Sequence, residues 1–198
     1  MIPIPYALSL GSPESSSVLT GYRTESSSDS LFAAVVSLHL DMAEELPDEQ
    51  LTSLLQNVLL AVPTAGALSS TPSAILQAMH HAALDSGRYF SAAVARRDTW
   101  RIDVTRCGLA SLLREEMSHG QMLLAPEFLQ GDDAPEVLDN ALGISWFKLS
   151  HDYGAAVGAR YFIVVGTKPD SGLPLASKGL PVADHFPRQR GGMALVIQ

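Results

Sequence analysis

The residue pair with the clearest metal-ligand character is His39 and Asp41, which stand two positions apart at the end of an apolar run. Residues i and i+2 of a β-strand point to the same side, so an imidazole and a carboxylate could bind one cation there. The alternative, which we favour, is that Asp41 begins a polar turn and His39 is partly buried. Four acidic residues follow: Glu44, Glu45, Asp48 and Glu49. We interpret them as the solvated start of a helix, where the helix dipole favours negative charge.

The other histidines offer weaker chemistry. His80 and His81 are adjacent on a predicted helix, where neighbours point about 100° apart and do not readily bind one ion. We predict that they pack in the core or at the surface. His151 and Asp152, next to Ser150, could form a proton-transfer pair, although nothing beside them has the character of an activated nucleophile.

Cys107 is the only cysteine, so no disulfide can form within the chain. Arg106 could favour the thiolate only if both side chains faced the same way, whereas adjacent strand residues face opposite ways. We therefore predict a buried, inert thiol. The glycines have neither Gly-x-Gly-x-x-Gly nor Walker spacing, which argues against a phosphate-binding loop.

Helices and strands must position these side chains. The apolar run 31–40 predicts a central strand that is covered on both faces. Apolar residues three and four positions apart predict amphipathic helices over 48–62 and 71–87. Residues 11–30 are rich in serine and predict a mobile loop between two strands, although a strand could begin at Val18.

The second half of the sequence favours strands. Three short runs with turns between them predict a β-meander over 89–95, 100–105 and 109–113. Further strands are expected at 147–150, 161–166 and 193–198. Another is expected at 122–128, where Pro126 favours either a sheet edge or an irregular segment. An exposed loop is expected over 129–142, and the Pro/Gly-rich segment 167–192 predicts a long connection. Regular β–α alternation is absent, so the pattern excludes a Rossmann fold and predicts an α+β fold: an antiparallel β-sandwich flanked by helices.

Composition limits the classes of function. The chain has 198 residues, 46% of them hydrophobic, which predicts a single domain over 1–198 with a proper core. Its formal net charge of −8 and scattered basic residues argue against nucleic acid as a partner. The single cysteine, the start without a basic region and the lack of a long apolar run predict a cytoplasmic protein with no membrane partner.

The order of segments resembles the metal-dependent serine/threonine phosphatases of type 2C, including their compact bacterial members. The family's opening Gly-x-Arg and Asn-Glu-Asp segment is similar to Gly21-Tyr22-Arg23 and the following residues 24–29. The family's strand that ends in an Asp-Gly metal motif is similar to 31–37. Three later segments are also similar to family motifs: 108–111 to its Gly-Asp-Ser-Arg corner, 158–168 to its Gly-Asp and Ser-Asp-Gly strand, and 190–197 to its closing Arg-Asp-Asn strand. The family places a helical pair where this chain has 167–192, so the resemblance implies a reduced C-terminal region.

The resemblance also implies that the metal ligands are lost. The family binds two divalent metals through Asp and Glu oxygens, and the metals activate the attacking water. The positions that correspond to these ligands carry no carboxylate here: Val36, Ser37, Thr167, Gly191 and Gly192. Because Mg²⁺ and Mn²⁺ require hard oxygen ligands, we expect no metal, no cofactor and negligible catalysis. Arg23 matches the family's phosphate-binding arginine and is a candidate anion site, with an ordinary ion pair as the favoured alternative.

The sequence thus predicts a catalytically inactive phosphatase-like domain, a pseudophosphatase, that acts by binding another protein as a regulator or scaffold. The serine-rich loop and the 167–192 connection would be its recognition surfaces, and self-association through sheet edges is a further expectation. The alternatives are an active hydrolase with a non-standard metal site around His39, Asp41 or His151, and a phosphate or phosphopeptide sensor that uses Arg23.

Overall fold

The computed structural model describes the following residues: 5–10, 18–26, 29–40, 46–62, 71–85, 90–98, 101–108, 110–118, 121–126, 136–139, 144–152, 160–166, 179–180 and 188–198. The helices and strands lie in this order: β1 (Tyr6–Leu10), β2 (Val18–Ser26), β3 (Ser30–His39), α1 (Asp48–Leu59), α2 (Pro72–Asp85), β4 (Phe90–Asp98), β5 (Arg101–Cys107), β6 (Ser111–Ser118), β7 (Gln121–Pro126), β8 (Glu136–Asp139), β9 (Ile144–Asp152), β10 (Tyr161–Val165), β11 (Gly179–Leu180), β12 (Arg188–Arg190) and β13 (Gly192–Ile197).

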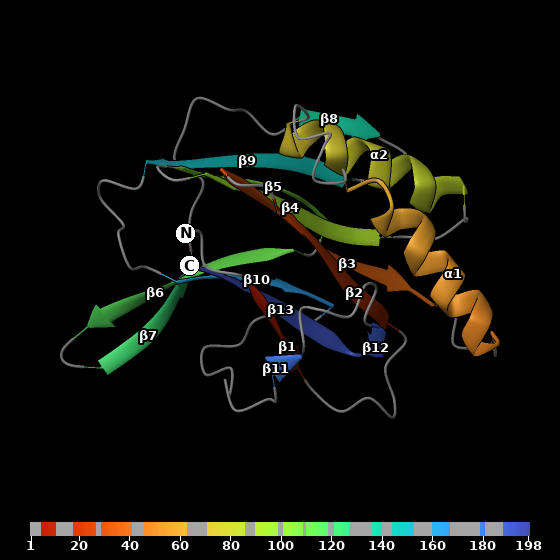
Figure 1. Cartoon of the computed structure of the whole chain (residues 1–198), viewed down its shortest axis with the longest axis horizontal. Helices are drawn as coiled ribbons and strands as arrows, with labels where there is room; N and C mark the ends of the chain where they lie inside the picture. Colours follow the sequence, from red (N-terminus) through yellow and green to blue (C-terminus); the bar gives the residue numbers. More distant parts are fainter. Residues whose placement is uncertain are drawn as a thin grey trace.

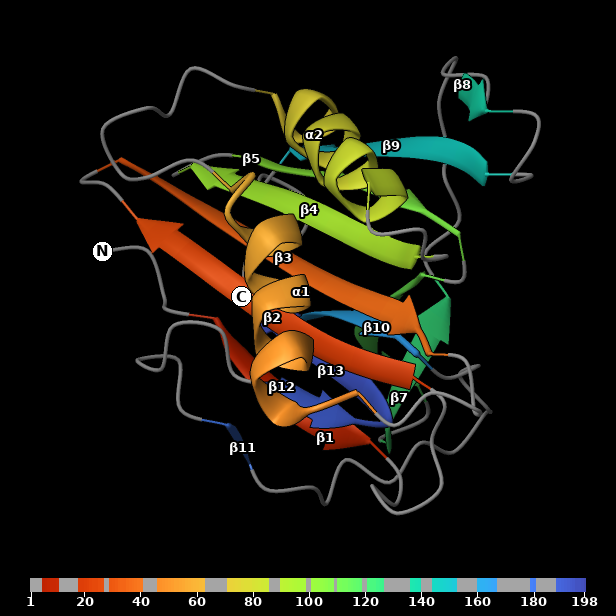
Figure 2. The same ribbon diagram turned by 90° about the vertical axis from the view of Figure 1, so that its right-hand side faces the viewer.

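The strands form two antiparallel sheets. One has six strands in the order β11-β1-β13-β10-β6-β7, and the other has seven in the order β12-β2-β3-β4-β5-β9-β8. The sheets form two layers, and α1 and α2 cover the outer face of the seven-stranded sheet (Figures 1 and 2). The α+β class that the sequence predicts is confirmed, with antiparallel pairing throughout the described ladders.

The helices form where capping and apolar spacing agree. The hydroxyl of Thr71 accepts a hydrogen bond from the backbone N–H of Ala74 at 3.2 Å, and Pro72 occupies the first helical position, where its missing N–H costs nothing. In α1 the exposed acids Asp48 and Glu49 lie in the first turn, as expected for a solvated helix start. Both helices bury their apolar stripes against β2, β3 and β4.

Strand β3 is the central strand that its apolar sequence predicts. Every residue from Ser30 to Leu38 is buried, and neighbours serve opposite faces. Val36 packs under the helices, whereas Val35 belongs to a second cluster that is shared by the two sheets. In that second cluster the seven-stranded sheet contributes residues such as Tyr22, and the six-stranded sheet contributes residues such as Ile163. A strand that is covered on both faces has no need of polar alternation.

Two predictions about local structure are wrong. The segment 11–30 is not one loop, because β2 occupies Val18–Ser26 and pairs with β3 along its length, which confirms the alternative of a strand that begins at Val18. Burial of residues such as Leu19 and Tyr22 outweighs the turn propensity of its Ser, Thr and Gly residues. The described residues of 129–142 include strand β8, which pairs with β9.

The predicted meander is also wrong, because the chain changes sheets after β5. Strand β6 pairs with β10 and β7, and the free side of β5 is taken by β9. Gly108 makes the change possible, since its φ of +61° lies in the left-handed region. The guanidinium of Arg106 holds the turn by donating to the carbonyl of Ala110 at 2.6 Å. A pattern of short strands does not reveal which sheet each one joins.

The remaining strand predictions are confirmed, with β7 at a sheet edge and β10 and β13 inside the six-stranded sheet. The predicted connection 167–192 contains β11 and β12, and its other residues up to Pro187 lie outside the described part of the chain. Within the residues that the structure describes, neither helix has the length and apolar character needed to span a membrane.

Candidate functional site

The two sheets are joined at the point where β12 leads into β13. Strand β12 pairs with β2, so that Arg190 lies opposite Leu19, whereas β13 pairs with β1 and β10. Gly191 lies between them with a φ of +107°, a conformation that side-chain-bearing residues rarely adopt. The chain therefore crosses from one sheet to the other at this glycine.

Hydrogen bonds to β2 hold this crossing. The backbone N–H of Gly191 donates to the carbonyl of Val18 at 3.0 Å. The hydroxyl of Thr20 donates to the carbonyl of Gly191 at 2.9 Å, in a buried bond between residues that are far apart in the sequence. A buried carbonyl that accepts such a bond is satisfied without water.

Gly166, the residue directly after β10, lies against the same crossing from the six-stranded sheet. Its φ is +78°, and a Cβ built on it would lie 3.0 Å from Cγ2 of Thr20 and 3.2 Å from both Cα of Gly192 and Cγ1 of Val18. Real Cβ atoms rarely approach neighbours so closely. We call Val18, Thr20, Gly166, Gly191 and Gly192 the sheet junction. Its small residues bring the backbones of the two sheets together.

The structure brings only some of the predicted metal-ligand positions to the sheet junction. Gly191 and Gly192 form part of it, and the buried Ser37 lies opposite Thr20 in the β2–β3 ladder. Directly opposed residues of a ladder share a face, so Ser37 is on the junction side of the sheet. Val36 lies on the opposite face, in the cluster under the helices. Thr167 lies outside the described residues.

The described residues of the sheet junction do not fit a divalent metal. Their side chains offer the hydroxyls of Thr20 and the neighbouring Ser37, and the hydroxyl of Thr20 already donates to a carbonyl. Mg²⁺ and Mn²⁺ sites in proteins are built mainly on carboxylates, and neutral hydroxyls supply none of that charge. Across the described ranges as a whole, no group of three or more His, Cys, Asp and Glu side chains could hold a metal ion.

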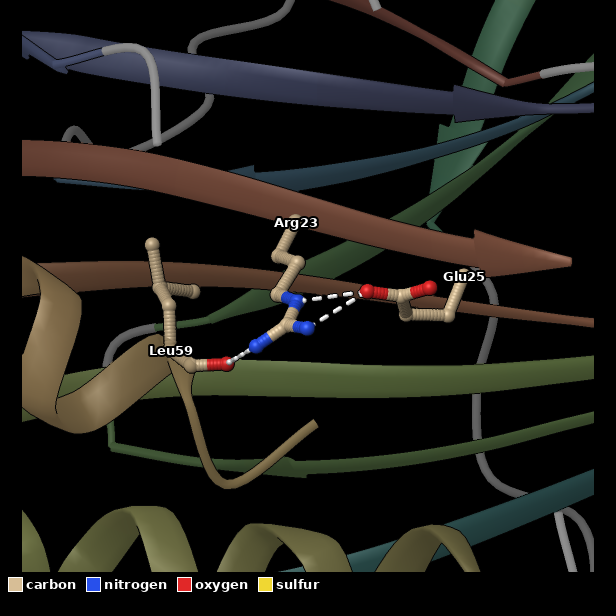
Figure 3. A network of polar contacts seen from close by, with 3 residues as sticks. All are labelled: Arg23, Glu25 and Leu59. Carbon is tan, nitrogen blue, oxygen red and sulfur yellow. Dashed lines mark hydrogen bonds and ion pairs between the residues drawn. The ribbon is translucent and has the colours of Figure 1, made fainter. Parts of the chain in front are cut away.

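Arg23, the candidate anion site, lies on the other face of β2. Its side chain is 8% exposed, and its Nε and Nη2 donate to one carboxylate oxygen of Glu25 at 2.9 and 2.5 Å (Figure 3). Its Nη1 donates to the carbonyl of Leu59 at 3.3 Å. Leu59 is the last residue of α1, which has no basic residue in its final turn. Arg23 therefore supplies from β2 the positive charge that a helix C-terminus favours.

The histidines are placed by ordinary packing. His39 is exposed at the end of β3, and Asp41, Glu44 and Glu45 lie outside the described residues. His80 is buried with its ring centroid 5.5 Å from that of Phe90, whereas His81 is exposed. For His151, Asp152 and the adjacent Ser150 the structure gives only the backbone of β9, which pairs with β5.

The prediction of a buried thiol at Cys107 is confirmed. Its side chain is fully buried in the cluster under the helices, and burial raises the pKa of the thiol to about 12. Arg106 turns the other way, toward Ala110. The thiol therefore stays protonated at neutral pH and is a poor nucleophile.

Sequence reasoning missed Gly166 and Thr20. Both stand beside predicted features, since Gly166 ends the apolar run of β10 and Thr20 follows the first residues of β2. A glycine between an apolar strand and a polar segment could have indicated a left-handed residue at a strand end. Nothing in the local sequence of Thr20 indicates that its partner is Gly191.

Two antiparallel sheets with helices on the outer face of one of them give this chain the fold of the metal-dependent, type 2C-like phosphatases. One solved structure with this architecture is RsbX, a type 2C phosphatase determined in complex with magnesium. The TM-score is 0.52 at 12% sequence identity, and the match covers 98% of this chain and 94% of RsbX. No family model matches the sequence, and no curated protein is significantly similar to it. The likeness to RsbX establishes the fold alone.

Proposed function

We propose that residues 1–198 form a single phosphatase-like domain that has lost metal-dependent catalysis and acts by binding another protein. The observation that carries this proposal is the sheet junction. Glycines and a threonine occupy the place where the two sheets meet, and a Cβ added at Gly166 would lie 3.0 to 3.2 Å from its neighbours on a left-handed backbone. The phosphatase-like fold is present, whereas the described residues of the sheet junction carry no carboxylate side chain.

The chemistry of the family supports this interpretation. Its catalysis requires metals that lower the pKa of a bound water, and such metals require several carboxylates around a shared space. The described residues of the sheet junction carry no carboxylate, and a Cβ added to Gly166 would meet its neighbours at 3.0 to 3.2 Å. The side-chain oxygen of Thr20 is engaged with Gly191. These residues supply no carboxylate ligands for a metal pair and its bridging water.

A binding role follows from a retained fold without its chemistry. The segments 11–17 and 167–187 lead into β2 and β12, which pair with each other next to the sheet junction, so they are the proposed recognition surfaces. Segments that connect the strands of a fold often carry partner recognition. Regulation or assembly is the proposed role, and the unreactive, buried Cys107 is compatible with the cytoplasm as the proposed location.

Calorimetric titration with Mn²⁺ and Mg²⁺, run beside hydrolysis of an aryl phosphate, tests the proposal. We expect no stoichiometric binding and no turnover. RsbX is the matched positive control, because it shares the fold and its structure contains magnesium. A tight Mn²⁺ site with turnover, lost in Asp29→Ala or Asp41→Ala, would instead establish an enzyme with a non-standard metal site. In that case the role of the sheet junction would be structural only.

A further inference from the structure

We draw no further inference here: the strongest candidate, the apolar outer face of the six-stranded sheet around Phe162, Val164 and Val196, is buried in the folded chain, and nothing in the part of the chain that the structure describes shows which segment covers it.

Discussion

The two faces of strand β2 carry polar groups with contrasting chemistry. On the helix side, Arg23 and Glu25 form a partly buried ion pair, and Arg23 also donates to the carbonyl of Leu59 at the end of α1. On the side of the other sheet, Thr20 forms a neutral hydrogen bond to Gly191. The described residues of the sheet junction carry no charged side chain, whereas the other face of β2 carries an ion pair beside a helix end. The hydrogen bonds of the sheet junction hold Gly191, where the chain crosses between the sheets, against β2.

The largest expected effect is that of placing a carboxylate in the sheet junction. Gly166→Asp should lower the free energy of unfolding by about 3 kcal/mol or more, because the left-handed backbone costs roughly 1–2 kcal/mol and overpacking adds a similar amount. Urea unfolding measures the loss. Gly166→Ala should show a substantial part of it, which would identify sterics as the cause. A stable Gly166→Asp protein that binds Mn²⁺ would show that the junction is still an adaptable metal site.

The second largest loss of stability is expected for a substitution of Arg23, on the helix side of β2. Arg23→Met leaves the largely buried carboxylate of Glu25 without this cation and should cost about 2 kcal/mol of stability, since breaking a buried pair is strongly destabilising. Arg101→Met is the matched control, because its 2.7 Å ion pair with Asp103 involves a side chain that is 44% exposed. Its loss should cost less than about 0.5 kcal/mol. Equal effects of the two substitutions would show that the Arg23 pair is an ordinary surface pair.

The smallest effect is expected for the hydroxyl in the sheet junction. Thr20→Val keeps the shape of the side chain but leaves the carbonyl of Gly191 without this donor, which should cost about 1 kcal/mol. Thr52→Val removes a hydroxyl that donates to Asp48 at 2.9 Å on the exposed surface of α1, and should be nearly neutral. The difference between the thermal unfolding of Thr20→Val and that of Thr52→Val isolates the contribution of the buried hydrogen bond. A neutral Thr20→Val would contradict a locking role for this hydrogen bond.

Sequence patterns predicted the elements well where burial and local propensity agree. For the apolar run of β3 and the spaced leucines of α1, local propensity and burial favour the same secondary structure. They failed at β2, where Ser, Thr and Gly favour turns but tertiary burial of Leu19 and Tyr22 imposes a strand. They failed again after Cys107, because the choice between sheets depends on long-range pairing that no local pattern encodes.

The candidate site was only partly accessible to sequence reasoning. The segment order identified Gly191 and Gly192 as positions without a carboxylate, and both lie in the sheet junction. A shift of one position along β3 separates Val36, under the helices, from Ser37, on the junction side, since neighbours on a strand face opposite ways. The contacts of Gly166 with Thr20 and Gly192 arise from three separate segments, so only the folded chain reveals them.

A sheet junction whose described residues carry no carboxylate should hold no metal. An anomalous difference map from crystals soaked in Mn²⁺ tests this at the site itself and over the rest of the chain. We expect no peak beside Gly166, Thr20 and Gly191, with the hydroxyl of Thr20 still bonded to the carbonyl of Gly191. A peak at the junction with oxygen ligands about 2.0–2.2 Å away would contradict the loss of the metal site and identify an active metal centre.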